Sequence, residues 1–453
     1  MVYPGPQLPA GRSTDPNAVP LIIVEGFLGG FGEAIWGGFE AHLNGNKPSA
    51  TKRRVMFADV GPVSSLHDRA CELYFTIMGG RVDYGEQHAS MNGHARFGRF
   101  HARGLYPEWS AEKPLHFLGH SMGGVTIVAL QRMLKEGFFG RGQHPDMMLS
   151  VTTVCAPFRG SQLVYTLGER TDAAPSVRPL SVGSALAKFV HVLGYLSPLL
   201  PKSFDLHADA RNLSFREASF STFFRQLWRS EWAESKDATP YDVTFDAADQ
   251  REARGEGITN ERTYYRSYVA CMTERSGPSG NTHVPSSAPL SSIPLQAFAS
   301  TVGSFDFSVL QPSPSFLKFK PGQAHDRTSD SESLSASSMN DYELGDEYWA
   351  NDGVVPLFSQ WHPLDCSRTN CHHIPPPPST DNAKEPTPTP INKIYNMPIP
   401  LQPGLWYVKT LNKSHHVSIM PFWWATQCQI EFWSELGGWL RQLDLSACET
   451  ETV

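Results

Sequence analysis

The chain has 453 residues, of which 40% are hydrophobic and 18% are charged, and its formal net charge is −7. This composition supports a large core and favours one large α/β domain with insertions over several independent domains. The negative charge, without a long block of lysine or arginine, argues against nucleic acid as a partner. Seven scattered cysteines, an odd number, indicate free thiols in a reducing compartment, although one surface disulfide is compatible with them.

The N-terminal residues 1–18 are rich in proline and glycine, and we expect them to be flexible. They contain no apolar run of signal-peptide length, so no Sec-type signal is visible, which favours the cytoplasm. No stretch reaches the roughly 18 to 20 uninterrupted apolar residues that span a bilayer, so no transmembrane segment is expected. The sequence gives no indication of the oligomeric state.

The first predicted element is a short apolar strand from Pro20 to Glu25, followed by a glycine-rich loop from Phe27 to Gly32. A second strand is expected from Arg54 to Asp59, and a helix from Ser64 to Met78.

The next motif is Gly119-His120-Ser121-Met122-Gly123, which lies between the apolar run Leu115–Leu118 and a predicted helix from Gly124 to Leu134. A serine between a strand and a helix is typical of a nucleophile elbow. Small residues two positions before and after it let the two elements approach, and the helix N-terminus supplies N–H groups to a developing oxyanion. The alternative is a chance match in a chain with 37 glycines.

The Val- and Thr-rich run Ser150–Ala156 is the next predicted strand and completes a βαβ unit around Ser121. The pattern therefore predicts an α/β-hydrolase fold with a mostly parallel, doubly wound sheet. In this fold the first strand-to-loop junction and the residue after the nucleophile donate the oxyanion-hole N–H groups, which assigns these roles to Phe27 and Met122.

We expect a single domain over residues 19–447, with a helical lid at about 160–235, whose alternative is ordinary core packing. Low-complexity insertions are expected at about 276–289, 312–340 and 366–392, and a tail at 448–453. Cys366, Cys371, His372 and His373 have metal-binding side chains, but without standard finger spacing a flexible loop is favoured.

Longer motifs make the chain resemble the thermoalkaliphilic, zinc-containing bacterial lipases of the α/β-hydrolase fold (family I.5 type), as a divergent member with long insertions. The similarity is colinear from about Val19 to about Leu443. The segments that carry it are Trp36–Gly38, Val60–Ser65, Asp68–Glu72, Gly79–Gly85, Gly93–Arg99, Tyr241–Asp242, Thr263–Tyr265, Thr273–Arg275 and Asn351–Val355.

The resemblance implies a catalytic triad of Ser121, Asp352 and His416, in the chain order of the hydrolase rule. His416 would take the serine proton, and Asp352 would orient the imidazole. His415 is the competing base, because only the alignment register separates the two histidines. The resemblance also implies secretion, whereas the missing signal peptide favours the cytoplasm. The sequence therefore does not decide between these two locations.

The resemblance further implies a structural zinc ion held by Asp68, His88, His94 and Asp242, since two imidazoles and two carboxylates can close a tetrahedral site. A calcium site is not expected. Ser418 stands where the family has a glutamate, and Pro421–Trp424 offers no carboxylate, although calcium prefers several oxygen ligands.

Glu25 is another departure, because the family has a histidine before the oxyanion-loop glycine. A charged carboxylate close to the pocket would weaken oxyanion stabilisation. The leading functional prediction is a triacylglycerol lipase-like enzyme that acts at a lipid–water interface through an acyl-enzyme on Ser121. The alternatives are a carboxylesterase for shorter acyl esters and a zinc-stabilised, non-catalytic scaffold with the hydrolase fold.

Overall fold

The computed structural model describes most of the chain. The described residues are 18–30, 32–45, 52–199, 205–207, 210–211, 213–277, 282–286, 293–317, 344–375, 401–420 and 425–450. The predictions of a flexible N-terminus over residues 1–17 and of loops over residues 318–340 and 376–392 lie outside these ranges.

The centre of the molecule is a seven-stranded sheet in which every neighbouring pair of strands is parallel. The strand order is β10-β11-β7-β6-β5-β1-β2, with crossovers that are typical of a doubly wound fold. The strands are β1 (Leu21–Val24), β2 (Val55–Phe57), β5 (Leu115–His120), β6 (Met148–Val154), β7 (Tyr264–Cys271), β10 (Cys371–Ile374) and β11 (Trp406–Asn412). The predicted parallel α/β sheet is therefore confirmed.

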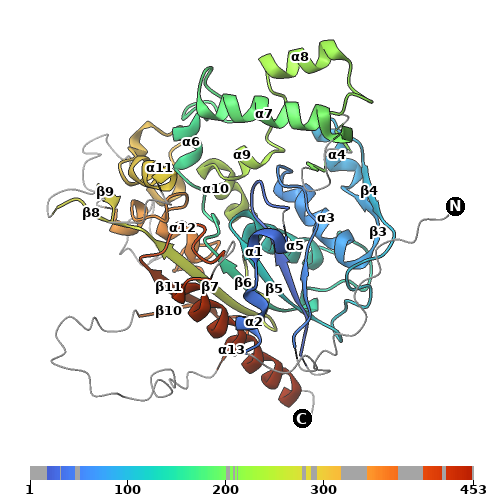
Figure 1. Cartoon of the computed structure of the whole chain (residues 1–453), viewed down its shortest axis with the longest axis vertical. Helices are drawn as coiled ribbons and strands as arrows, with labels where there is room; N and C mark the ends of the chain where they lie inside the picture. Colours follow the sequence, from blue (N-terminus) through green and yellow to red (C-terminus); the bar gives the residue numbers. More distant parts are fainter. Residues whose placement is uncertain are drawn as a thin grey trace, which may run out of the picture.

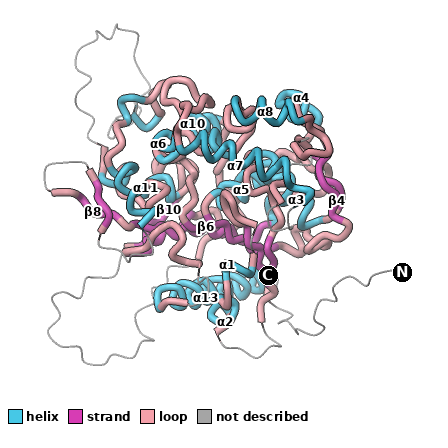
Figure 2. Tube along the Cα trace, turned by 45° about the horizontal axis from the view of Figure 1, so that its top comes forward, coloured by secondary structure: helices cyan, strands magenta, loops and turns pink. Residues whose placement is uncertain are grey.

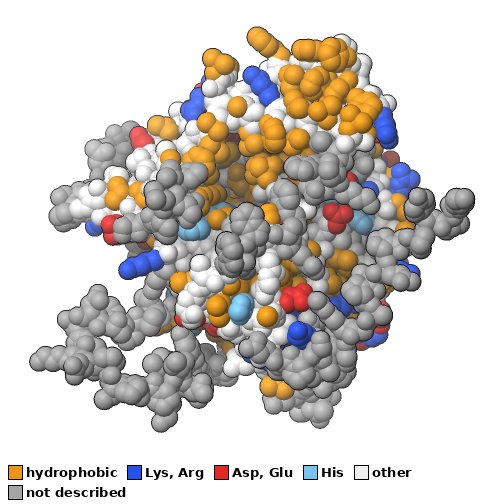
Figure 3. Space-filling view, viewed as in Figure 1, with side chains coloured by type: hydrophobic (Ala, Val, Ile, Leu, Met, Phe, Trp, Pro, Cys, Tyr) orange, Lys and Arg blue, Asp and Glu red, His pale blue; other side chains and the backbone are white. Residues whose placement is uncertain are grey.

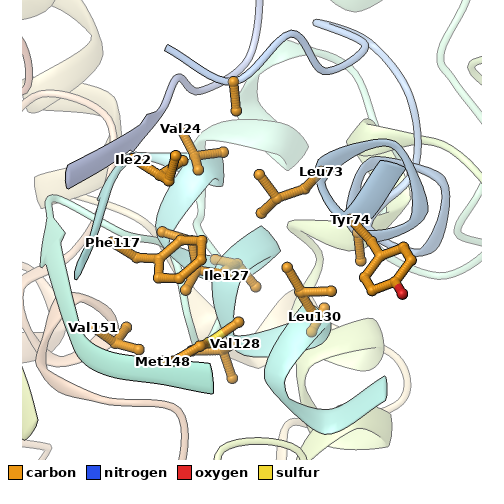
Figure 4. Close-up of a cluster of buried hydrophobic side chains, with 14 of the residues drawn as sticks. Ile22, Val24, Leu73, Tyr74, Phe117, Ile127, Val128, Leu130, Met148 and Val151 are labelled. Atoms are coloured by element: carbon orange, nitrogen blue, oxygen red, sulfur yellow. The ribbon is translucent and has the colours of Figure 1, made fainter. Parts of the chain in front are cut away.

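Helices cover both faces of this sheet (Figure 2). One face packs against α3 (Leu66–Met78) and α5 (Met122–Lys135), and the other against α1 (Glu33–Trp36), α2 (Phe39–Leu43) and α13 (Gln427–Thr450). Successive side chains of β1 point to opposite faces of the sheet and so pack into the two helix layers in turn. Ile22 and Val24 join the cluster with α3 and α5 (Figure 4), whereas Leu21 and Ile23 join the cluster with α13. Burial on both faces explains why β1 is continuously apolar.

A second group of helices lies beyond the carboxyl ends of the central strands, on the side away from α13 (Figure 1). It contains α6 (Leu163–Leu167), α7 (Val182–Leu196), α8 (Phe220–Trp228), α9 (Thr239–Asp242), α10 (Phe245–Ala253), α11 (Ile293–Gly303) and α12 (Leu357–Trp361). Apart from short 3-10 helices, the other described elements are α4 (Glu86–Asn92) and two antiparallel strand pairs, β3 (Gly80–Asp83) with β4 (Phe97–His101) and β8 (Thr273–Arg275) with β9 (His283–Pro285).

Two predicted low-complexity segments contain regular structure. Residues 283–285 form β9, within the range 276–289, and residues 371–374 form the edge strand β10, within the range 366–392. Helix α13 also continues to residue 450, into the predicted tail. These segments pair with neighbouring strands or continue a packed helix, which composition alone does not reveal.

Candidate active site

Ser121 lies at the junction between β5 and α5, in a backbone conformation that is rare for residues with a side chain. Its φ of 53° and ψ of −127° turn the chain sharply from strand to helix. The flanking glycines are required because neighbouring backbone atoms leave no room for a side chain. A Cβ on Gly119 would lie 2.4 Å from the Gly124 nitrogen, and one on Gly123 would lie 2.0 Å from the Val24 carbonyl oxygen. The elbow motif thus folds as the sequence predicts.

The structure brings the three residues of the predicted triad together. The His416 Nε2 atom lies 3.0 Å from Ser121 Oγ, and His416 Nδ1 lies 2.8 Å from Asp352 Oδ2. The other carboxylate oxygen of Asp352 accepts hydrogen bonds from the backbone N–H groups of Val354 (2.9 Å) and Val355 (2.7 Å). Asp352 is fully buried, so these donors and the imidazole are what compensate its charge.

The geometry separates the two adjacent histidines. The His415 backbone N–H donates to Ser418 Oγ at 2.7 Å, which turns the local chain so that the His416 ring, and not the His415 ring, contacts Ser121. Burial lowers the pKa of His415. The neighbouring ring of His120 is fully buried, and this burial lowers its pKa to about 3, so His120 is neutral and its Nε2–H donates to the His416 carbonyl at 2.8 Å.

The predicted oxyanion-hole residues Phe27 and Met122 line the same cavity as Ser121. A Cβ on Gly26 would lie 2.7 Å from the Ser121 Cβ, so the loop that carries Phe27 passes directly beside the nucleophile. Within the part of the chain that the structure describes, the N–H groups of Phe27 and Met122 donate to no backbone acceptor. Two such N–H groups beside Ser121 suit an oxyanion.

Glu25 does not point its charge at this hole. Its Oε2 accepts hydrogen bonds from the N–H groups of Gly30 (2.9 Å) and Gly32 (3.1 Å), and its Oε1 accepts one from Trp36 Nε1 (2.9 Å). The side chain is buried and fixes the glycine-rich loop. The expectation that Glu25 weakens oxyanion stabilisation therefore lacks a structural basis, because all three contacts face the loop and α1.

A cavity of about 150 Å³ extends from Ser121 beneath the helices α6 and α7. Its lining is mostly apolar, and includes Leu163, Val164, Leu167, Leu186, Trp232 and Val243. Such a lining suits a hydrocarbon chain better than a polar ligand.

One acidic residue, Glu169, also lines the cavity, and its Oε1 has no hydrogen-bond partner within the described ranges. Burial raises the pKa of Glu169 from 4.5 to about 8. Between pH 4.5 and about pH 8, Glu169 is protonated in the folded chain and ionised in the unfolded chain. The contribution of Glu169 to the free energy of unfolding therefore falls as the pH rises through this range.

We expect Glu169→Gln, which cannot ionise, to stabilise the protein at pH 9 by up to about 5 kcal/mol, at about 1.4 kcal/mol for each unit of the pKa rise, and to have little effect at pH 4. Denaturant unfolding at both pH values measures the difference. The exposed Glu261→Gln is the control, with no change expected at either pH. An equal effect of Glu169→Gln at pH 4 and pH 9 would assign its effect to packing instead of ionisation.

A cluster of metal-binding side chains lies between α3, α4 and the segment before α9. The His88 Nε2 atom lies 3.2 Å from Asp68 Oδ1 and 3.2 Å from Asp237 Oδ1, and His94 Nε2 lies 3.4 Å from Asp237 Oδ2. In a tetrahedral zinc site with bonds of about 2.0–2.2 Å, neighbouring ligand atoms are separated by about 3.4 Å. Among the residues that the structure describes, the buried Asp68 Oδ1 and His94 Nε2 atoms have no hydrogen-bond partner, so the cluster fits a cation.

The structure corrects the fourth member of this cluster. Asp242 was predicted, but Asp237 lies with Asp68, His88 and His94. The Asp242 Oδ2 atom instead accepts a hydrogen bond from the Leu66 N–H at 2.8 Å, at the start of α3. Sequence similarity around Tyr241 and Asp242 pointed to the right segment, but the turn before α9 faces the cluster with Asp237.

Arg211, which sequence reasoning missed, donates from Nη2 to Asp68 Oδ2 (2.7 Å) and to Asp237 Oδ2 (2.6 Å). It neutralises part of the carboxylate charge from outside the cluster.

The expected absence of a calcium site stays a prediction, since Pro421–Trp424 lies outside the described residues.

Comparisons with known proteins agree with this architecture. A family model described as "Lipase-like, C-terminal domain" matches residues 17–285, which is more than half of the chain. A lipase of Staphylococcus hyicus is 29% identical over 281 residues, which cover 57% of this chain and 41% of that protein. Lipase 2 of Staphylococcus aureus is 26% identical over 374 residues, which cover 77% of this chain and 45% of that protein. The chain thus spans less than half the length of these relatives.

Solved structures show the same fold. The Staphylococcus hyicus lipase has a TM-score of 0.67 at 21% identity, with 97% of this chain and 99% of that chain covered. EstA from Clostridium botulinum has a TM-score of 0.59 at 24% identity, with 94% and 89% covered. The parallel sheet, the elbow and the family match lead to one conclusion: the chain belongs to the lipase-like, C-terminal domain family and has the α/β-hydrolase fold.

Proposed function

We propose that the protein is a lipase that hydrolyses carboxylic ester bonds of lipids, similar to a triacylglycerol lipase, through an acyl-enzyme on Ser121. The observation that carries this proposal is the contact of His416 with both Ser121 Oγ (3.0 Å) and Asp352 Oδ2 (2.8 Å) at the mouth of an apolar cavity. The relatives named above are lipases, which supports the same reaction class.

In the proposed reaction, His416 Nε2 takes the Ser121 proton as Oγ attacks the ester carbonyl carbon. The carbonyl oxygen gains the negative charge and accepts hydrogen bonds from the N–H groups of Phe27 and Met122. When the tetrahedral intermediate collapses, the ester C–O bond breaks and His416 gives its proton to the leaving alcohol. Water then repeats these steps on the acyl-enzyme, releases the fatty acid and restores Ser121. Asp352 stabilises the imidazolium in both halves.

The outer helices support a lipid substrate over a soluble one. The inner side of α7 is buried through Ala187 and Val190, whereas Phe189 on the same helix is 53% exposed. Together with α8, whose Phe220, Phe224 and Trp228 are exposed, it forms an apolar surface above the cavity (Figure 3). We infer that these helices form the lid predicted at 160–235 and that they contact the lipid–water interface.

One helix within the described ranges, Val182–Leu199, is long and apolar enough to cross a membrane by length and composition. Because one side of α7 packs on the domain and lines the cavity, an interfacial role explains its apolar surface.

We expect hydrolysis of p-nitrophenyl esters by the parent protein to be faster for long acyl chains than for short ones, and Ser121→Ala to lower kcat by about 10⁵-fold. Rates are measured across acyl lengths for both proteins. A decline beyond short chains would indicate a carboxylesterase. Equal rates for the parent and Ser121→Ala would indicate a non-catalytic scaffold.

We further propose that Asp68, His88, His94 and Asp237 hold a structural zinc ion. With four protein ligands the ion would have no open position for hydrolysis, and it would join α3 and α4 to the segment before α9. Ser121 and its partners carry the chemistry without it.

Removal of this site has a matched control. We expect Asp237→Asn and His88→Ala to lose one bound zinc and to lower the melting temperature by about 5 °C. Asp242→Asn should keep the zinc, because the Asn side-chain oxygen still accepts from Leu66. Elemental analysis and thermal unfolding measure both effects. Zinc loss in Asp242→Asn with retention in Asp237→Asn would restore Asp242 as the ligand.

A further inference from the structure

A second group of metal-binding side chains lies at the β10 edge of the sheet, outside the proposed active site. It consists of His362, Cys366, Cys371 and His373, whose four potential ligand atoms all lie within 4.8 Å of one another. The sequence favours a flexible loop here. The structure instead places His362 directly after α12, Cys366 in the following turn, and the other two residues on β10.

The distances match a tetrahedral metal site. The Cys366 Sγ atom lies 3.5 Å from His362 Nε2 and 3.5 Å from His373 Nε2. Bonds of about 2.3 Å from zinc to sulfur and about 2.0–2.1 Å from zinc to nitrogen place such S···N pairs about 3.5 Å apart. A thiol can donate to one imidazole and accept from the other, so these two contacts alone also fit hydrogen bonds, and it is the convergence of all four ligand atoms that indicates a metal site.

The local structure aims all four side chains at one point. Cys371 and His373 alternate on β10 and therefore lie on the same side of the sheet, whereas His372 lies on the opposite side, with its ring 6.2 Å from that of Tyr407. His362 Nδ1 lies 2.6 Å from the Leu364 carbonyl oxygen. When Nδ1 donates to this carbonyl, Nε2 is left with a lone pair directed at the cluster, as in metal-binding histidines.

We propose that His362, Cys366, Cys371 and His373 form a second structural zinc site, with two thiolate and two imidazole ligands. Two sulfur and two nitrogen ligands are typical of structural zinc, and four protein ligands leave no open position, so the site would be structural. Cys366 and Cys371 are both free thiols, as thiolate ligands require.

The site would hold the edge of the sheet against the segment that carries the acid of the triad. Strand β10 has four residues, and among the strands that the structure describes it pairs with β11 alone. On the other side of the site, Gln360 of α12 donates to the carbonyls of Ala270 (3.0 Å) and Val355 (2.9 Å), and the Val355 N–H donates to Asp352. A zinc ion bound by His362 would therefore join β10 to α12, whose Gln360 holds Val355, the residue that donates to Asp352.

Variants of the full chain, analysed for zinc after purification in a zinc-containing medium, test the site. Cys366→Ser, Cys371→Ser and His373→Ala are expected to contain one zinc per chain fewer than the parent. The matched controls are His372→Ala, on the opposite side of β10, and Cys428→Ser, an exposed free cysteine of α13, which should equal the parent. Unchanged zinc in all three site variants, or equal loss in the controls, would overturn the proposal.

The parent protein provides a test that does not depend on the folding of variants. An organic mercurial that blocks thiolates should release one zinc per chain, whereas an Asp and His site keeps its metal. Cobalt in place of zinc should give the thiolate-to-cobalt charge-transfer absorption that carboxylate and imidazole ligands lack. Mercurial treatment without zinc release, or a disulfide between Cys366 and Cys371 in the purified protein, would overturn the proposal, whatever the metal content of the Asp68 cluster.

Discussion

His416→Ala is expected to lower kcat for ester hydrolysis by about 10⁴-fold or more, because Ser121 loses its general base. His415→Ala is the matched control and should stay within about 3-fold of the parent, a factor worth less than about 1 kcal/mol. His415 differs by one position, yet only the His416 ring contacts Ser121 Oγ, at 3.0 Å. Single-turnover rates with a p-nitrophenyl ester measure both variants.

The double variant Ser121→Ala/His416→Ala sharpens this expectation. Residues that act as a unit lose activity together, so the double variant should be no slower than the slower of the two single variants. A loss in the double variant equal to the product of the single losses would mean that the two residues act independently. A large loss in His415→Ala with an active His416→Ala would assign the base to His415.

The central part of the fold is predictable from local sequence. Strands β1, β2, β5 and β6 lie within or overlap the predicted apolar runs, since parallel strands buried on both faces are continuously apolar. The elbow motif is local in sequence, and the clash that requires Gly119 involves the nearby Gly124, whereas the clash that requires Gly123 involves Val24 of β1, far earlier in the chain.

Contacts between distant segments are not predictable in this way. Asp237 and Asp242 are both carboxylates near α9, and only the folded turn decides which of them faces His88. The cluster at β10 has a clear local signal in Cys366, Cys371 and His373, but its fourth member, His362, precedes the motif. Its role depends on the turn between α12 and β10.

Glu25→Gln is expected to lower kcat by about 10- to 100-fold with little change in KM, because the loop that positions the Phe27 N–H loses an acceptor. One carboxylate oxygen of Glu25 accepts from Gly30 and Gly32, and the other accepts from Trp36 Nε1. The glutamine amide has one acceptor oxygen and one donor nitrogen. Whichever way it is oriented, a donor faces a donor on one side, at a cost of about 1–3 kcal/mol.

Trp36→Phe distinguishes loop positioning from general destabilisation. In Glu25→Gln/Trp36→Phe, the amide oxygen is free to accept from both glycine N–H groups while its NH₂ group faces a ring without an indole N–H. The second substitution should therefore restore part of the kcat that the first removes. Trp109→Phe, which loses a buried hydrogen bond from Nε1 to the Met147 carbonyl, is the control for stability. Recovery of kcat by Trp36→Phe and not by Trp109→Phe would mean that Glu25 acts through the orientation of the loop amides. If neither substitution restores kcat, the loss in Glu25→Gln comes from the missing charge, and the coupling through Trp36 is wrong.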